Sequence, residues 1–172
     1  MRWICVKGGS LRVNGSTNVN KFNCDIKGYS NPDTLIVYKT VAGTQLEGTV
    51  NLDIGHFDCH NSIMTSDLRK TLKAKEFPLL KIRFLSLSKF PGLKPLQEDV
   101  KGLVEIQLAG VTKRFDVAYK ISMGPDKIIH LVGTRNVNFT DFSIVPPRKM
   151  GGMIKTDNQL AIEFKLDFRQ YD

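Results

Sequence analysis

The stretch LVEIQLAGVTKRFDVAYKI, residues 103–121, decides the class of fold. On both sides of Ala109-Gly110, apolar residues recur at every second position. Such alternation places one face of a strand against an interior and the other in water, which is typical of an antiparallel sheet. The glycine suits a tight turn between the two runs, so the stretch predicts a hairpin. The residues expected on its inner face are Val104, Ile106, Leu108, Phe115, Val117, Tyr119 and Ile121.

The same period runs through the rest of the chain. It is clear in residues 160–168, where Phe164 and Leu166 share a face. Further strands are predicted by alternation and by flanking glycine and proline around 3–7, 10–15, 17–29, 46–55, 80–90 and 128–140.

One segment predicts a helix, near residues 65–74. Met64, Leu68 and Leu72 recur at every fourth position and form one apolar stripe. Ser66 is the expected N-cap of this helix, and Pro78 prevents its continuation.

About eight strands and one helix favour either a closed barrel or a two-sheet sandwich. Residues 80–90 favour the barrel. There Ile82 and Phe84 fall on one face, and Leu85 and Leu87 on the other. A strand that is apolar on both faces can line a cavity inside and lie under a covering segment outside. The prediction is an all-β chain, an extended antiparallel β-barrel of about eight strands in a single domain, 1–172.

Charge and composition limit the function classes. The net charge is +8, but the basic residues are scattered, and no run of like charges or basic-aromatic motif marks a nucleic-acid site. Nucleic acid is therefore not an expected partner, whereas weak contact with an anionic membrane is compatible with the charge. Hydrophobic residues make up 41% of the chain, and no apolar run has the length of a transmembrane helix.

Sequence motifs for catalysis are absent. The chain has no nucleophile elbow, no phosphate-binding loop and no zinc-protease motif, and no cofactor is expected. The densest polar cluster is DIGHFDCHN, where His56, Asp58 and His60 would share one face of a strand. These side chains are more readily explained as exposed residues at a strand end than as metal ligands, because no second ligand pair follows at fixed spacing. No metal is predicted. The cluster is kept as the polar centre of an alternative function, an enzyme acting on an isoprenoid or quinone.

Cys24 and Cys59 each end a Phe-polar-Cys triplet, FNC and FDC. They are either a disulfide between facing strands, which implies an oxidising compartment, or two buried thiols. Cys5 has no partner under either reading. No secretion signal is recognisable before Lys7, so either the chain is cytoplasmic or a leader has been removed.

Four motifs together resemble the YceI-like family of lipid-binding proteins. They are GSTNVNKFNC, FDCHNSIMTSDLRKTLKAKEFPLLKIRF, GLVEIQLAGVTKRFDVAY and TDFSIVPP, and the resemblance extends over residues 10–168. It implies a lipocalin-like barrel that binds, stores or transports a polyisoprenoid or similar long-chain lipid, without a catalytic role established for the family. It also implies export to the bacterial periplasm, occasional homodimers, and a Cys24–Cys59 disulfide. At the positions of Asn20 and Phe22, many members have a histidine and an aromatic residue, so this chain differs from them at Asn20.

An apolar tail binds largely through buried area, so its expected contacts are the apolar side chains of the barrel and of the covering helix. Ordinary core packing is the alternative role for each of them. The predicted tail contacts are Met64, Leu68, Leu72, Phe84, Phe115, Val117, Tyr119, Phe139, Phe164 and Leu166.

The sequence Asn-Val-Asn occurs twice, after Gly15 and after Gly133. Both copies are expected in strands, each with two amides and then an aromatic residue on one face. We interpret the repeat mainly as scaffold. Asn18 and Asn136 are the candidate contacts for a lipid headgroup.

Overall fold

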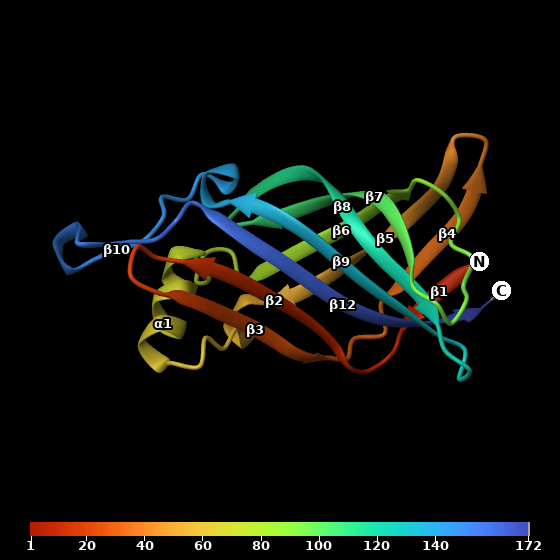
Figure 1. Ribbon diagram of the computed structural model, residues 1–172, viewed down its shortest axis with the longest axis horizontal. Helices are drawn as coiled ribbons and strands as arrows, with labels where there is room; N and C mark the ends of the chain where they lie inside the picture. The colour runs from red at the N-terminus through yellow and green to blue at the C-terminus, as the bar shows by residue number, and fades with distance from the viewer. Residues whose placement is uncertain (172) are drawn as a thin grey trace.

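Strands make up most of the molecule, as the alternation predicts. The computed structural model describes residues 1–171, and Figure 1 shows its elongated barrel with one helix near one end. The strands are β1 (Arg2–Cys5), β2 (Gly9–Ser16), β3 (Lys21–Tyr29), β4 (Thr34–Thr40), β5 (Gly43–Asp53), β6 (Leu79–Leu87), β7 (Glu98–Leu108), β8 (Val111–Met123), β9 (Ile128–Asn138), β10 (Arg148–Lys149), β11 (Ile154–Lys155) and β12 (Gln159–Tyr171). The helical elements are α1 (Ser62–Thr71) and the 3-10 turns η1 (Ile54–His56), η2 (Phe139–Phe142) and η3 (Met150–Gly152).

Eight strands form a closed antiparallel ring. Their order is β1-β4-β5-β6-β7-β8-β9-β12, and β12 pairs with β1 to complete it. The same β12 pairs along Ala161–Lys165 with β2, which carries β3 on its other edge. Closure through β1 and β12 leaves no end strand in the ring of eight, whereas β3 has a free edge. The predicted barrel of about eight strands is therefore confirmed.

The barrel interior is filled with side chains. Phe84 and Tyr119 both pack edge-to-face on Phe164, with ring centroids 6.0 Å apart in each pair. At the end that holds both termini, Trp3 packs on Phe168. Alternating residues of every long strand reach this core, which explains the period-two signal.

The glycine of each Asn-Val-Asn repeat makes room for an aromatic ring. A β-carbon added at Gly133 would lie closer than 3.0 Å to three ring atoms of Phe164. At Gly15, two ring atoms of Phe22 and a methyl carbon of Leu160 would be equally close. Glycine in a strand often marks such a close approach. The scaffold interpretation of the repeat thus has a packing basis in both copies.

The β6 strand corrects one part of the argument for a barrel. Its pairings with β5 and β7 both shift register near Phe84, which marks a β-bulge. The extra residue returns Leu87 to the interior beside Phe84 and leaves Leu85 half-exposed. The prediction that Leu85 and Leu87 share an outer face is wrong, because a bulge reverses the alternation.

The larger differences from the predicted strands are one missed strand and one misplaced strand start. The segment 34–40, which was not among the predicted strands, forms β4 and pairs with both β1 and β5. The predicted strand 17–29 begins only at Lys21, because Thr17 to Asn20 form a turn in which the Thr17 hydroxyl accepts hydrogen bonds from Val19 N and Asn20 N.

We expect Tyr119→Phe to raise the free energy of unfolding by roughly 1–2 kcal/mol. The Tyr119 hydroxyl is buried and has no hydrogen-bond partner among residues 1–171. Burial also raises the pKa of this phenol. Removing an unpaired hydroxyl relieves its desolvation cost and keeps the ring. Urea unfolding of both proteins measures the difference, and a clear loss of stability in the variant would show that the hydroxyl has a partner.

Candidate ligand-binding groove

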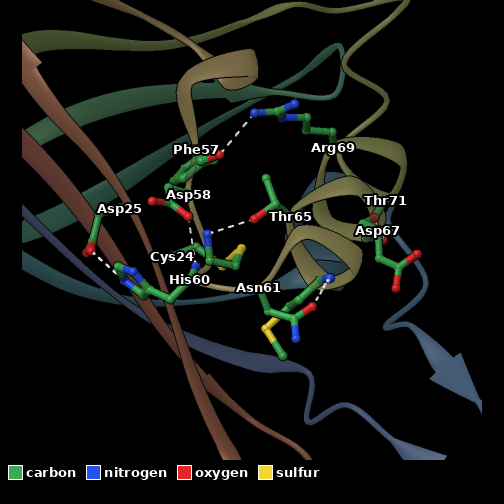
Figure 2. Close-up of a disulfide and its surroundings, with 12 residues drawn as sticks. Cys24, Asp25, Phe57, Asp58, His60, Asn61, Thr65, Asp67, Arg69 and Thr71 are labelled. Atoms are coloured by element: carbon green, nitrogen blue, oxygen red, sulfur yellow. Dashed lines mark hydrogen bonds and ion pairs between the residues drawn. A yellow bond between two sulfur atoms is a disulfide. The ribbon is translucent and has the colours of Figure 1, made fainter.

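A disulfide attaches the free edge of β3 to the segment that follows η1. Cys24 and Cys59 are bonded, as the resemblance implied, and Figure 2 shows their surroundings. Next to them, Asp25 and Asp58 exchange two backbone hydrogen bonds, N to O, of 2.9 and 2.8 Å. The matching triplets FNC and FDC therefore lie side by side. Residues 57–60 continue the barrel wall at this end without forming a strand of their own.

A charged network covers the outer side of this junction. The Asp25 carboxylate accepts a hydrogen bond from Arg12 Nε at 2.8 Å and lies 3.0 Å from His60 Nε2. Burial alone would raise the pKa of Asp25, but the bonds with Arg12 and then with His60 outweigh it and lower that pKa. Asp25 is only 4% exposed. Its charge lies within the barrel wall and is paired with Arg12 and His60, as a buried charge requires.

The Asp25 network predicts a dependence of stability on pH. Because its pKa is lower in the folded protein than in the unfolded chain, where it is about 3.9, the stabilisation is present above that value. It is lost as the pH falls through the folded value. Asp25→Asn should lower the free energy of unfolding near pH 7 by roughly 1–2 kcal/mol, and this difference should shrink below about pH 4.

Urea unfolding at a series of pH values measures this difference. The matched control is Asp116→Asn, which changes an exposed carboxylate and should leave the profile unchanged. A difference between wild type and Asp25→Asn that persists unchanged at pH 2 would contradict the assignment.

Helix α1 is held against the same junction. The Asn61 side chain accepts hydrogen bonds from Ile63 N and Met64 N, and so caps the helix. Thr65 Oγ1 accepts a hydrogen bond from Cys59 N, and Arg69 donates one to the Phe57 carbonyl (Figure 2). The helix begins at Ser62, three residues before the predicted start. Ser66 is not its N-cap, because Asn61 already satisfies the first amide groups.

A groove of about 290 Å³ lies between α1, the β2–β3 turn and the β10–β11 hairpin. The hairpin is tied to the turn, because Asn18 Nδ2 donates to the Met153 carbonyl and Asn18 Oδ1 accepts from Lys155 N. Lys149 in the lining forms an ion pair with Asp67 of α1. Most of the remaining lining is apolar and includes Phe22, Met64, Leu68, Phe139, Pro147 and Ile154.

The groove continues toward the barrel core. Leu68 and Phe139 line both the groove and a narrow internal void of about 30 Å³. The void is lined almost entirely by buried apolar side chains, among them Leu72 and Leu160. An apolar chain bound in the groove would thus contact Leu68 and Phe139, the two side chains that also line the internal void.

The predicted tail contacts divide into two groups. Met64, Leu68 and Phe139 line the groove, and Leu72 lines the void behind it. The others pack in the filled core and border neither space; they are Phe84, Phe115, Val117, Tyr119, Phe164 and Leu166.

The two candidate headgroup residues do not come together. Asn18 lies in the turn beside the groove, and its amide already binds the β10–β11 hairpin. Asn136 is exposed and borders a separate, polar surface hollow of about 850 Å³ over β8 and β9. The hollow is open to solvent and lined by charged and amide side chains such as Lys101, Asp116 and Arg135, so it does not suit an apolar ligand.

The polar cluster of the enzyme alternative does not face a cavity. His56 ends η1, and Asp58 and His60 follow it outside any named strand, so the predicted strand is absent although the three side chains do lie on one side. Phe57 and Cys59 point inward, while His56, Asp58 and His60 are exposed. Within residues 1–171, no group of three or more His, Cys, Asp or Glu side chains is placed to hold a metal ion.

Several groove residues were not predicted. Val19, Ile63 and Ile154 line the groove as apolar side chains in a turn, at a helix start and in a two-residue strand. Val19 falls in the predicted strand 17–29, where the structure has a turn, and Ile63 and Ile154 have no periodic neighbourhood to mark them. Pro147, the last residue of the TDFSIVPP motif, also borders the groove and was not a predicted contact.

The fold is that of the YceI-like proteins. No family model matches the sequence, and no curated protein matches it. Several solved structures match the fold of this chain. BcnA of Burkholderia cenocepacia superposes with a TM-score of 0.68 at 11% identity, over 92% of this chain and 95% of that protein.

A polyisoprenoid-binding domain from Saccharophagus degradans has a TM-score of 0.65 at 10% identity, over 99% of this chain and 98% of the domain. The YceI protein of Campylobacter jejuni has a TM-score of 0.60 at 15% identity, over 86% of each chain. Within residues 1–171, no helix has the length and hydropathy needed to cross a bilayer.

Proposed function

We propose that this chain is a YceI-like binding protein that stores or transports a polyisoprenoid or similar long-chain lipid without altering it chemically. The observation that carries the proposal is the apolar groove, of which two lining residues, Leu68 and Phe139, also line a void in the core. The polyisoprenoid-binding domain of Saccharophagus degradans, which has the same fold, supports the ligand class.

The energetics suit such a ligand. Each buried methylene contributes about 0.8 kcal/mol, so several isoprene units bind through area alone. The groove is at the small end of the usual range for ligand pockets, roughly 300–1,000 Å³. The first units of a tail would lie against Met64 and Phe22. Deeper insertion would require Leu68 and Phe139 to move aside and join the groove to the void.

The polar residues of the groove mouth would lie beside the ligand headgroup. Thr17, Asn20 and Thr156 line the groove and are at least partly exposed. Asn18 supports this mouth by holding the hairpin in place, and we propose it as a headgroup neighbour in that position. Asn136, on the surface hollow, is set apart from this role.

We further propose that the protein acts in an oxidising compartment such as the bacterial periplasm. The Cys24–Cys59 disulfide supports this proposal, because cytoplasmic thiols are normally kept reduced. The enzyme alternative has no comparable support, since its His56, Asp58 and His60 cluster lies on the outer surface.

Native mass spectrometry and solvent extraction of the purified full chain test the ligand class directly. We expect a co-purifying lipid, or binding of an added long-chain isoprenoid alcohol with one ligand per chain. If neither a bound lipid nor saturable binding of the isoprenoid is detected, the proposal is wrong.

Met64→Asp should weaken binding of the isoprenoid alcohol by about tenfold or more, because it places a charge in the apolar lining. Met64 is only partly buried, so the barrel should still fold. The matched control is Ser66→Asp, which adds the same charge to the same helix at an exposed position outside the groove. Titration of both variants with a fluorescent isoprenoid measures the effect, and equal affinities would place the tail elsewhere.

A further inference from the structure

Large apolar side chains are exposed at the α1 end of the barrel, and four of them come from three neighbouring segments. Val19, Ile63, Met150 and Met153 are 65%, 69%, 69% and 72% exposed, and we call them the tip cluster. They belong to the β2–β3 turn, the first turn of α1 and the tip of the β10–β11 hairpin. Exposed apolar groups gathered in one region of a soluble protein commonly mark a contact surface.

The tip cluster lies next to the groove, and two of its four members line it. Val19 and Ile63 line the groove directly, and Ile154 lines it from the hairpin that carries the two methionines. The bonds from Asn18 to Met153 and Lys155 fix that hairpin beside the turn. Figure 1 shows α1 and β10 at the end of the barrel away from both termini.

Basic residues flank the tip cluster. The turn, α1 and the hairpin region, residues 17–21, 62–71 and 145–157, contain two carboxylates, Asp67 and Asp157. Asp67 is paired with Lys149, and Asp157 accepts a hydrogen bond from Ser16. The same three segments contain six cations, namely Lys21, Arg69, Lys70, Arg148, Lys149 and Lys155.

Most of these cations are not neutralised within the protein. Among residues 1–171, Lys149 is the one of the six that pairs with a carboxylate. Arg69 donates to the Phe57 carbonyl, which leaves its charge in place. The end of the barrel therefore combines protruding apolar side chains with uncompensated positive charge.

We propose that this end of the barrel docks on the surface of an anionic lipid bilayer. Met150 and Met153 would enter the headgroup region, as the apolar side chains of interfacial proteins do, and the flanking cations would face anionic headgroups. A second copy of the chain is the less suitable occupant, because two such surfaces would bring like charges together. Docking in this orientation places the groove mouth against the bilayer.

Docking goes beyond the proposed ligand and does not depend on it. A bilayer can bind the tip cluster whether or not the groove takes up a tail. If the protein does not bind vesicles, the proposal that it binds an isoprenoid in solution still stands. If it does not bind an isoprenoid, the proposal that it docks on a bilayer still stands.

The first experiment is sedimentation of the full chain with vesicles of phosphatidylcholine, with and without one-fifth phosphatidylglycerol. We expect binding at least about tenfold tighter to the anionic vesicles. Raising the salt from about 0.05 to 0.5 M should weaken it, because the Debye length shortens. Absence of binding to the anionic vesicles at low salt would overturn the proposal.

The second experiment removes the apolar contacts. Met150→Ser/Met153→Ser should weaken vesicle binding by about tenfold or more. The matched control is Val41→Ser/Leu96→Ser, because these side chains are 111% and 84% exposed and lie in the β4–β5 turn and the β6–β7 loop. Figure 1 shows both connections at the end that holds the termini. Equal losses in the two double variants would overturn the proposal.

A third experiment reports the orientation. Trp3 is the one tryptophan in the sequence and is 0% exposed, so it supplies a constant background. Met153→Trp should show a blue-shifted emission on addition of anionic vesicles, whereas Leu96→Trp should not. A homodimer in solution that Met150→Ser/Met153→Ser abolishes, together with no emission shift of Met153→Trp, would assign the surface to a second copy instead.

Discussion

Replacing both bridge cysteines, Cys24→Ser/Cys59→Ser, is expected to lower the free energy of unfolding by about 3–4 kcal/mol. The disulfide closes a loop with a sequence separation of 35 residues, and its removal restores the conformational freedom of the unfolded chain. It also releases the free edge of β3, which otherwise depends on the backbone exchange between Asp25 and Asp58. Urea unfolding of the variant and the wild type measures the difference.

A reductant provides the matched control. It should lower the stability of the wild type to that of the variant and leave the variant unchanged. The remaining thiol does not interfere, because burial raises the pKa of Cys5 to about 12, with smaller contributions from Asp33 and Asp167. Cys5 is therefore a protonated, buried thiol at neutral pH. If reduction leaves the stability of the wild type unchanged, the bridge is not a structural support.

The second large effect concerns the ring cluster in the barrel centre. Phe164→Ala should lower the free energy of unfolding by about 3–5 kcal/mol. Phe164 is 2% exposed and packs against both Phe84 and Tyr119. Its removal takes away the contacts of a buried ring and leaves a cavity that the closed barrel cannot easily collapse.

Gly133 offers a direct test of how that ring is accommodated. Gly133→Ala alone should cost about 1–3 kcal/mol, because the added methyl group meets the Phe164 ring. In the Phe164→Ala background the same change should be nearly neutral. A double-mutant cycle by urea unfolding measures this coupling, and additive effects would show that the cost at Gly133 has another origin.

The barrel was predictable from sequence where one face of a strand meets the core. Strands β7, β8 and β12 are long and have one buried face, so each has several alternating residues. In β4 the buried alternation is limited to Leu35 and Val37, although the β-branched and aromatic residues of TLIVYKT favour a strand. The bulge in β6 was not predictable, because an extra residue alters the alternation without a distinct residue type.

The groove was harder to predict than the fold. Met64, Leu68 and Leu72 were found because a helix that covers a core repeats its apolar residues. Pattern alone did not distinguish groove lining from ordinary core, so Phe84 and Phe115 were grouped with Phe139. The hairpin side of the groove has strands of two residues, and its position depends on hydrogen bonds between Asn18 and residues more than 130 positions away.

The pairing of β12 has a consequence for how the chain folds. This last strand binds β9, β2 and β1, so residues 2–5 of the chain find their place beside residues 168–171. Barrel closure thus joins the two most distant parts of the sequence, and such non-local pairing makes folding slow. During synthesis β1 and β2 can pair with β4 and β3, but each gains its second neighbour, β12, only when that strand leaves the ribosome. The barrel therefore cannot close until the last of its eight strands has been synthesised.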